Sequence, residues 1–194
     1  MQGVSSALLH ASTLTLVAFS ALATVDGVYI HLIRLRLHTR PDSRLEHVWH
    51  SVGAVLAVPG FYALFAVVSG GALLWFGIAL AALGQLVEWI DMASEKASRA
   101  PLGGLGSFEY ILHAILTATR NVAFALSLAA RPVSAFSLSS RNIIESIDEP
   151  YATVVWMIFG GAVAMAFLHV LLAARYRPSN RWETVVAGVA RGSS

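Results

Sequence analysis

Carboxylate and imidazole side chains recur at helical spacing in three short stretches of this sequence. The pairs are Glu46 with His50, Glu88 with Asp91, and Glu109 with His113. Residues three or four positions apart share one face of a helix, so each pair can reach a single ion. Helical bundles bind two metal ions with pairs of this kind, projecting inward from facing helices. The spacing therefore predicts a metal site that draws its ligands from three helices.

Further candidate ligands lie beside these pairs. His47 is three residues before His50 and shares its helix face, while Asp26 and His31 are assigned as additional ligands or as partners of the ligands. The full predicted set is Asp26, His31, Glu46, His47, His50, Glu88, Asp91, Glu109 and His113. Because the sequence has no cysteine, only oxygen and nitrogen ligands are available. This chemistry predicts two iron ions, with manganese or zinc as the alternatives.

Several of these residues also have a purely structural interpretation. Ser43 and Glu46 have the spacing of a capping box, which predicts a helix that begins near Ser43. Glu95 and Lys96 are interpreted as ordinary loop charges, and His169 as a core histidine on an apolar helix. The metal hypothesis therefore depends on the pairs occurring together at one depth, since no single residue carries it.

The elements that must position these side chains are membrane-spanning helices. The 194-residue chain is 57% hydrophobic and 12% charged, whereas soluble domains carry about 25% charged residues. Five apolar segments of ~20 residues can each cross a hydrocarbon core of ~30 Å. They cover approximately residues 8–33, 48–68, 72–92, 108–130 and 151–173. We expect an all-α integral membrane bundle, with residues 1–194 forming one transmembrane domain; four spans plus one run buried in protein is the alternative.

Basic residues fall mostly on one side of this five-span arrangement. That side carries Arg34, Arg36, Arg40, Arg44, Lys96, Arg99, Arg175, Arg177 and Arg181. The other side receives Arg131 and Arg141. The positive-inside rule then places the N-terminus outside and the C-terminus inside a multi-pass protein of the cell membrane, most simply a bacterial inner membrane. The candidate ligands lie near the cytoplasmic boundary in this orientation.

Two charged residues, Asp26 and Arg120, are expected inside the hydrocarbon region. Ionisable groups at that depth are costly and need a partner, so each marks a site or a buried pair. Asp26 could complete the metal site or relay protons. Arg120 requires a carboxylate, an anionic substrate group or backbone carbonyls, and an Asp26–Arg120 pair depends on helix tilt.

The favoured function is a metal-dependent oxidoreductase that acts on a lipid-soluble substrate at the cytoplasmic face. A b-type cytochrome is the runner-up, since His31, His50, His113 and His169 lie near span ends and a pair could ligate haem. A transporter or a non-catalytic subunit of a membrane complex also stays open. The expected partners are the lipid bilayer, a hydrophobic substrate or redox partner, and further copies of the chain. The sequence has no stripe of basic residues interleaved with aromatic ones, so nucleic acid is not among the expected partners.

Overall fold

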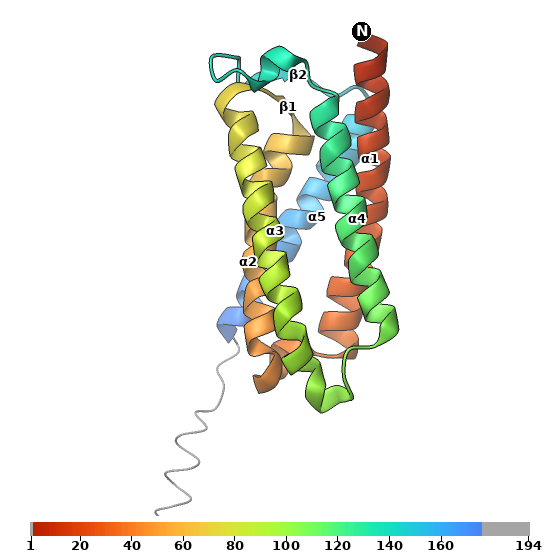
Figure 1. Cartoon of the computed structure of the whole chain (residues 1–194), viewed down its shortest axis with the longest axis vertical. Helices are drawn as coiled ribbons and strands as arrows, with labels where there is room; N and C mark the ends of the chain where they lie inside the picture. The colour runs from red at the N-terminus through yellow and green to blue at the C-terminus, as the bar shows by residue number, and fades with distance from the viewer. Residues whose placement is uncertain (1, 176–194) are drawn as a thin grey trace, which may run out of the picture.

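The chain folds into five long helices that run side by side (Figure 1). The structure is a computed structural model that describes residues 2–175 and is 84% helical. All five helices are long and apolar enough to cross a membrane. The predicted all-α bundle with five candidate spans is confirmed to that extent. Arg177 and Arg181, which were counted with the basic residues, lie outside the described residues.

Two of the five long helices change their winding before they end. The elements are α1 Gln2–Thr24 with its π-helical continuation η1 Val25–Arg34, α2 Arg44–Phe61 with its π-helical continuation η4 Tyr62–Ala66, α3 Gly71–Arg99, α4 Ser107–Ala129 and α5 Tyr151–Arg175. The short 3-10 turns are η2 Leu37–Thr39, η3 Pro41–Ser43, η5 Ala100–Leu102 and η6 Val133–Phe136. The predicted spans cover the apolar middle of each long helix, because hydropathy does not detect the polar turns at helix ends.

The C-terminal end of α3 corrects the sequence analysis, which placed Glu95 and Lys96 in a loop. The helix continues to Arg99 and gives way to the turn η5, where Pro101 has no N–H to extend the hydrogen-bond ladder. Glu95, Ser98 and Arg99 are buried along one face of this extension. Polar contacts to neighbouring helices, rather than apolar burial, therefore hold the last turns of α3 in place.

The start of α2 was predicted in the right place for the wrong reason. α2 begins at Arg44, directly after Ser43, but the Ser43 side chain makes no capping hydrogen bond. Its hydroxyl accepts a hydrogen bond from Ser98 Oγ at 2.7 Å, and the Glu46 carboxylate accepts one from Arg99. The predicted capping box is wrong, because both side chains are used in contacts with α3.

The helices pack as two close pairs, α2 with α3 and α1 with α4, and α5 packs mainly on α2 (Figure 1). The N-terminus lies at one end of the bundle and α5 finishes at the other. We call the end where α5 finishes the basic end. It carries the turns η2, η3 and η5 together with Arg34, Arg36, Arg40, Arg44, Lys96 and Arg175.

The opposite end, which we call the sheet end, is closed by a small antiparallel sheet. It pairs β1 Val68–Ser69 with β2 Ile143–Glu145. Gly71 has a φ of +58° at the point where the chain turns from β1 into α3, and a Cβ there would lie 2.5 Å from the carbonyl oxygen of Ser140. Only glycine fits this turn, since both its backbone conformation and its surroundings exclude a side chain.

Arg131 stabilises the sheet end through hydrogen bonds to backbone carbonyl oxygens. Its guanidinium donates to the carbonyl oxygens of Leu64 at 2.9 Å and Ser69 at 3.0 Å, and to Ser127 Oγ at 2.7 Å. These carbonyls lie where η4 ends and helical partners run out. Burial lowers the pKa of Arg131 to about 10, so it stays charged at neutral pH. None of the carboxylates of residues 2–175 pairs with it.

The apolar core is concentrated toward the sheet end. Its largest cluster gathers Leu64, Leu74, Ala123 and Val155 from four different elements. A smaller cluster of Ile30, Leu112 and Leu116 lies closer to the basic end. The remaining interior at the basic end is lined by polar side chains, which is unusual for a bundle of helices that are apolar enough to cross a membrane.

Candidate metal centre

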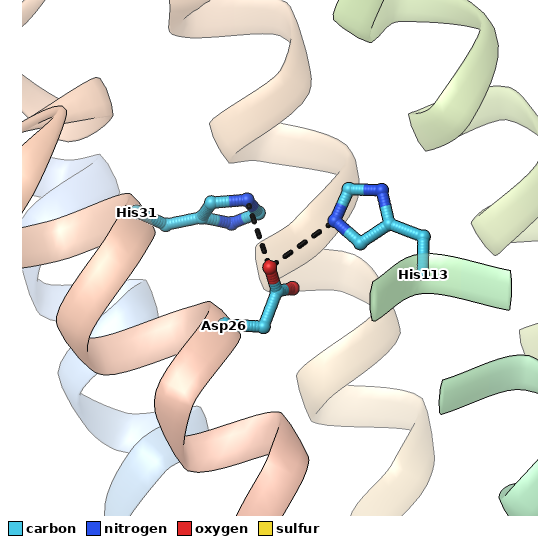
Figure 2. A group of neighbouring side chains, drawn as sticks. All are labelled: Asp26, His31 and His113. Atoms are coloured by element: carbon cyan, nitrogen blue, oxygen red, sulfur yellow. Dashed lines mark hydrogen bonds and ion pairs between the residues drawn. The ribbon is translucent and has the colours of Figure 1, made fainter. Parts of the chain in front are cut away.

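Three of the predicted ligands meet inside the bundle near the basic end. Figure 2 shows the Asp26 carboxylate between the rings of His31 and His113. Asp26 Oδ1 lies 3.1 Å from His113 Nε2 and 3.6 Å from His31 Nε2. One ligand atom from each residue lies within 4.8 Å of the other two, and all three residues are buried. We call this group the Asp26 triad.

The π-helical winding of η1 explains how Asp26 and His31 come to share a face. These residues are five positions apart, a spacing that points them in different directions on an ordinary α-helix. The wider turn of η1, with i→i+5 hydrogen bonds, brings them into register. Leu35 N–H bonds Ile30 O at 2.8 Å and continues this pattern at the end of the segment. π-Helical turns often occur at functional sites for this reason.

His50 and Asp91 extend the triad from α2 and α3. His50 Nδ1 lies 3.2 Å from Asp91 Oδ2, and the centres of the His50 and His31 rings are 5.2 Å apart. A Cβ at Gly27 would lie 3.7 Å from His50 Nε2, so this nitrogen faces the η1 backbone. An imidazole whose Nδ1 is held by a carboxylate has a fixed orientation and a more basic Nε2, as metal-bound histidines commonly do.

His113 has a second carboxylate beside it, from Glu95 on α3. Glu95 Oε1 lies 3.2 Å from His113 Nδ1, within ion-pair distance, although the angle is not that of a hydrogen bond. His113 therefore stands between Asp26 at Nε2 and Glu95 at Nδ1. The sequence analysis did not include Glu95 among the candidate ligands.

Arg99 binds two other carboxylates that were predicted as ligands. Its Nη1 donates to Glu46 Oε2 and its Nε to Glu109 Oε1, both at 2.7 Å. Its Nη2 lies 3.3 Å from His31 Nε2, and the Arg99 side chain is 1% exposed. Glu46 and Glu109 are thus brought to the cluster, but one oxygen of each is occupied by a guanidinium rather than turned toward the triad.

The structure places Glu88 with Arg120 instead of with the other candidate ligands. The Arg120 guanidinium donates to the Glu88 carboxylate and, at 2.6 Å, to Gln85 Oε1; the Thr117 hydroxyl donates to Glu88 as well. Asp26 and Arg120 do not pair, because Asp26 is engaged by His113 and His31. Glu88 therefore lies outside the cluster, about two turns from Glu95 along α3.

The remaining histidines continue the cluster toward the basic end. The ring centres of His47 and His169 are 5.4 Å apart, and those of His169 and His50 are 4.8 Å apart. His38 follows at 6.2 Å from His47. His47 Nε2 and His169 Nδ1 are buried without a hydrogen-bond partner among the described residues. Such atoms require an explanation, because nearly all buried polar atoms are satisfied.

A cavity of about 310 Å³ runs from this cluster into the apolar part of the bundle. Its polar end is lined by Asp26, His31, His50, Asp91, Glu95 and His113. Its other end is lined by apolar side chains that include Leu16, Phe65 and Phe124, and Glu88 and Arg120 lie between the two ends. An apolar cavity with a few convergent polar groups is the usual form of a small-molecule site.

Arg99, Glu95, His38 and His169 belong to this cluster but were not among the predicted metal ligands; His169 was considered only as a core histidine or a haem ligand. A signal for two of them was present: Asp91, Glu95 and Arg99 follow one another at intervals of four and lie on one helix face. No local signal marks His169, which is a single polar residue on the most apolar helix. Comparisons with protein-family models, with curated proteins and with solved structures find no match to this chain, so its function must be argued from the site itself.

Proposed function

We propose that this chain is a membrane metalloprotein whose principal metal ion is held by the Asp26 triad, and that it acts as an oxidoreductase on a lipid-soluble substrate. The observation that carries the proposal is the buried convergence of one carboxylate and two imidazoles within 4.8 Å. Two histidines and one carboxylate with open positions are the ligand set of many non-haem iron(II) enzymes. Iron is therefore the first candidate, with manganese or zinc next.

The distances in the triad suit a bound ion. Nitrogen and oxygen ligands lie ~2.0–2.2 Å from such a metal, so two ligands on one ion are at most ~4.4 Å apart. The separations from Asp26 Oδ1 to His113 and His31 already fall inside this limit. The remaining separation, between the two imidazole nitrogens, is within 4.8 Å, and His50 lies beside the group with its ring centre 5.2 Å from that of His31.

The charge balance of the cluster also favours a cation. Its carboxylates are Asp26, Glu46, Asp91, Glu95 and Glu109. Among residues 2–175, Arg99 is the only arginine or lysine that forms an ion pair with any of them. The other three, Asp26, Asp91 and Glu95, lie beside histidines, which compensate them only when protonated; a divalent ion would supply positive charge with the imidazoles neutral.

A second ion of the predicted pair has a candidate place at His47 and His169. Both side chains are buried, and each keeps one ring nitrogen without a partner. His50 stands between this pair and the triad, since its ring is near both His169 and His31. We therefore retain two ions as the proposed stoichiometry, with the triad as the tighter site.

The proposed reaction class is oxygenation of the substrate by O2. Hydroxylation places one oxygen atom of O2 in a C–H bond and reduces the other to water, which consumes two protons and two electrons. A redox partner must supply these electrons, because the chain has no cysteine to hold an iron–sulfur cluster or to form a disulfide. The positive-inside rule places the basic end at the cytoplasmic face of the cell membrane, where such a donor would dock.

Metal analysis of the purified, detergent-solubilised full chain tests the proposal. We expect iron, manganese or zinc at one to two ions per chain, and loss of at least one ion in the His113→Ala variant. His10→Ala is the matched control, since His10 stacks on Tyr151 and is not part of the cluster. Protein that lacks metal, or His113→Ala protein that retains all of it, would overturn the proposal. A Soret band in the same sample would favour the cytochrome instead.

A further inference from the structure

A groove on the flank of the bundle lies next to the cavity described above, and few side chains separate the two. The groove lies between α3 and α4, has a volume of about 450 Å³, and is lined by residues such as Ile78, Trp89 and Leu128. Three residues, Leu64, Ala81 and Phe124, line both the groove and the cavity. The groove and the cavity therefore share a wall made of these three residues.

The contact between α3 and α4, the two helices that flank this groove, differs from the contacts that α3 makes with α2 and α4 makes with α1. α3 packs closely on α2, and α4 packs closely on α1. Between α3 and α4 the contacts include a set of polar bonds that we call the polar bridge. It joins Gln85 and Glu88 of α3 to Thr117, Arg120 and Asn121 of α4. α3 and α4 do not pack closely on each other, so this seam can widen without separating a close-packed helix pair.

The cavity has the polarity of a lipid that stands in one leaflet. Its polar end lies near the basic end of the bundle, and its apolar end lies deeper among the helices. Along α4 it extends from His113 to Phe124, which is ~16 Å at 1.5 Å per residue. A leaflet lipid likewise has its head group at the membrane surface and its chain toward the centre. It could therefore slide sideways into the cavity without turning over.

We propose that the cavity binds a single-chain lipid with a small polar head, such as a long-chain acid, aldehyde or alcohol, which enters from the bilayer between α3 and α4. The head group lies at the Asp26 triad and the chain extends toward Leu16, Phe65 and Phe124. We call the opening between α3 and α4 the portal, and the polar bridge is the latch that holds it closed. This inference rests on the proposed function for the identity of the reacting group, while the binding of the chain depends only on the cavity.

A cross-link across the seam tests the portal. The side chains of Gln85 and Asn121 are 3.4 Å apart, and the chain has no cysteine of its own. The Gln85→Cys/Asn121→Cys variant can therefore be closed specifically with dibromobimane. The probe is palmitic acid with a diazirine near its methyl end, photolysed in lipid nanodiscs and mapped by peptide mass spectrometry. Gln85→Cys alone, treated with the same reagent, is the control.

We expect the control to be labelled at cavity residues such as Leu16 and Phe65, and the cross-linked variant to lose that labelling. Both proteins should still be labelled at exposed residues such as Met157, which is 73% exposed. Ala81→Leu places a larger side chain between the groove and the cavity without any reagent. This variant should also reduce labelling of the cavity. Labelling confined to the outer surface in the control, or unchanged cavity labelling after cross-linking, would overturn the portal.

Metal content of the same samples separates this inference from the proposed function. If the protein holds no metal but its cavity is labelled through the seam, the portal is supported and the proposed metalloenzyme function is contradicted. Protein with metal whose cavity is never labelled would keep the metal centre and remove the portal.

Discussion

Two buried arginines, at opposite ends of the bundle, solve the same electrostatic problem in different ways. Arg131 at the sheet end satisfies its donors with backbone carbonyls and two serine hydroxyls. Arg99 at the basic end satisfies them with two carboxylates, a histidine and Ser98. The first arrangement fixes backbone and needs no ionised partner. The second collects ionisable side chains, which is costly in a membrane protein unless the site uses them.

The difference indicates what each end is for. The sheet end combines Arg131 with the largest apolar cluster and the Gly71 turn, features that serve stability. The basic end has a small apolar cluster and a large group of polar side chains around a cavity. We therefore expect substitutions at the sheet end to affect folding alone, and those at the basic end to affect metal binding as well.

The largest effect on stability is expected from Arg99→Met. This substitution leaves Glu46 and Glu109 as buried carboxylates without a counter-charge, which typically costs about 3–5 kcal/mol when one partner of a buried pair is removed. Unfolding in detergent with increasing SDS measures the loss.

The control for this prediction is the triple variant Arg99→Met/Glu46→Gln/Glu109→Gln, which removes the two charges as well. It should recover a substantial part of the lost stability. A triple variant no more stable than Arg99→Met would mean that charge compensation is not the main role of Arg99.

A smaller loss is expected from Arg131→Met at the sheet end. The Ser69 carbonyl loses its Arg131 donor, whereas the Leu64 carbonyl still accepts from the Ser127 hydroxyl, and a buried unsatisfied group costs about 1–3 kcal/mol. The same SDS titration gives the stability, and elemental analysis gives the metal content per folded chain. The metal content should equal that of the unmodified protein. Loss of metal from Arg131→Met would contradict the division of roles between the two ends.

The smallest effect is expected at the polar bridge, between the two ends. Glu88 also accepts hydrogen bonds from Gln85 and Thr117, so it keeps partners when Arg120 is replaced, and its ion pair is expected to be worth less than those of Arg99. A double-mutant cycle of Arg120→Met and Glu88→Gln should give a coupling of about 1 kcal/mol. A coupling as large as that between Arg99 and Glu46 would show that the seam between α3 and α4 is a rigid contact and not a latch.

The features that depend on local sequence were predictable. Apolar runs located all five helices, because a span requires about 20 apolar residues whatever its neighbours do. Helical periodicity correctly placed the Glu109–His113 pair on one face, and both residues are buried. Even the expectation that a buried arginine needs a carboxylate held for Arg120, although its partner is Glu88 and not Asp26.

The features that depend on tertiary contacts were not predictable. Arg99 binds carboxylates on α2 and α4; its spacing from Asp91 and Glu95 places it on their helix face, but nothing in the local sequence identifies the carboxylates that it binds. Asp26 and His31 meet only because η1 winds as a π-helix. On an α-helix, residues five positions apart would point in different directions. Three predicted ligands, Glu46, Glu88 and Glu109, instead form ion pairs with arginines from other helices.

The central claim is that imidazoles of the Asp26 triad bind a metal ion inside the bundle. X-ray absorption at the edge of the metal found in the purified protein tests it most directly. We predict nitrogen and oxygen neighbours at about 2.0–2.2 Å, with outer-shell scattering from at least two imidazole rings. That scattering should be weakened in His31→Ala and unchanged in His10→Ala. A metal signal without imidazole scattering, or identical spectra for the two variants, would contradict the account.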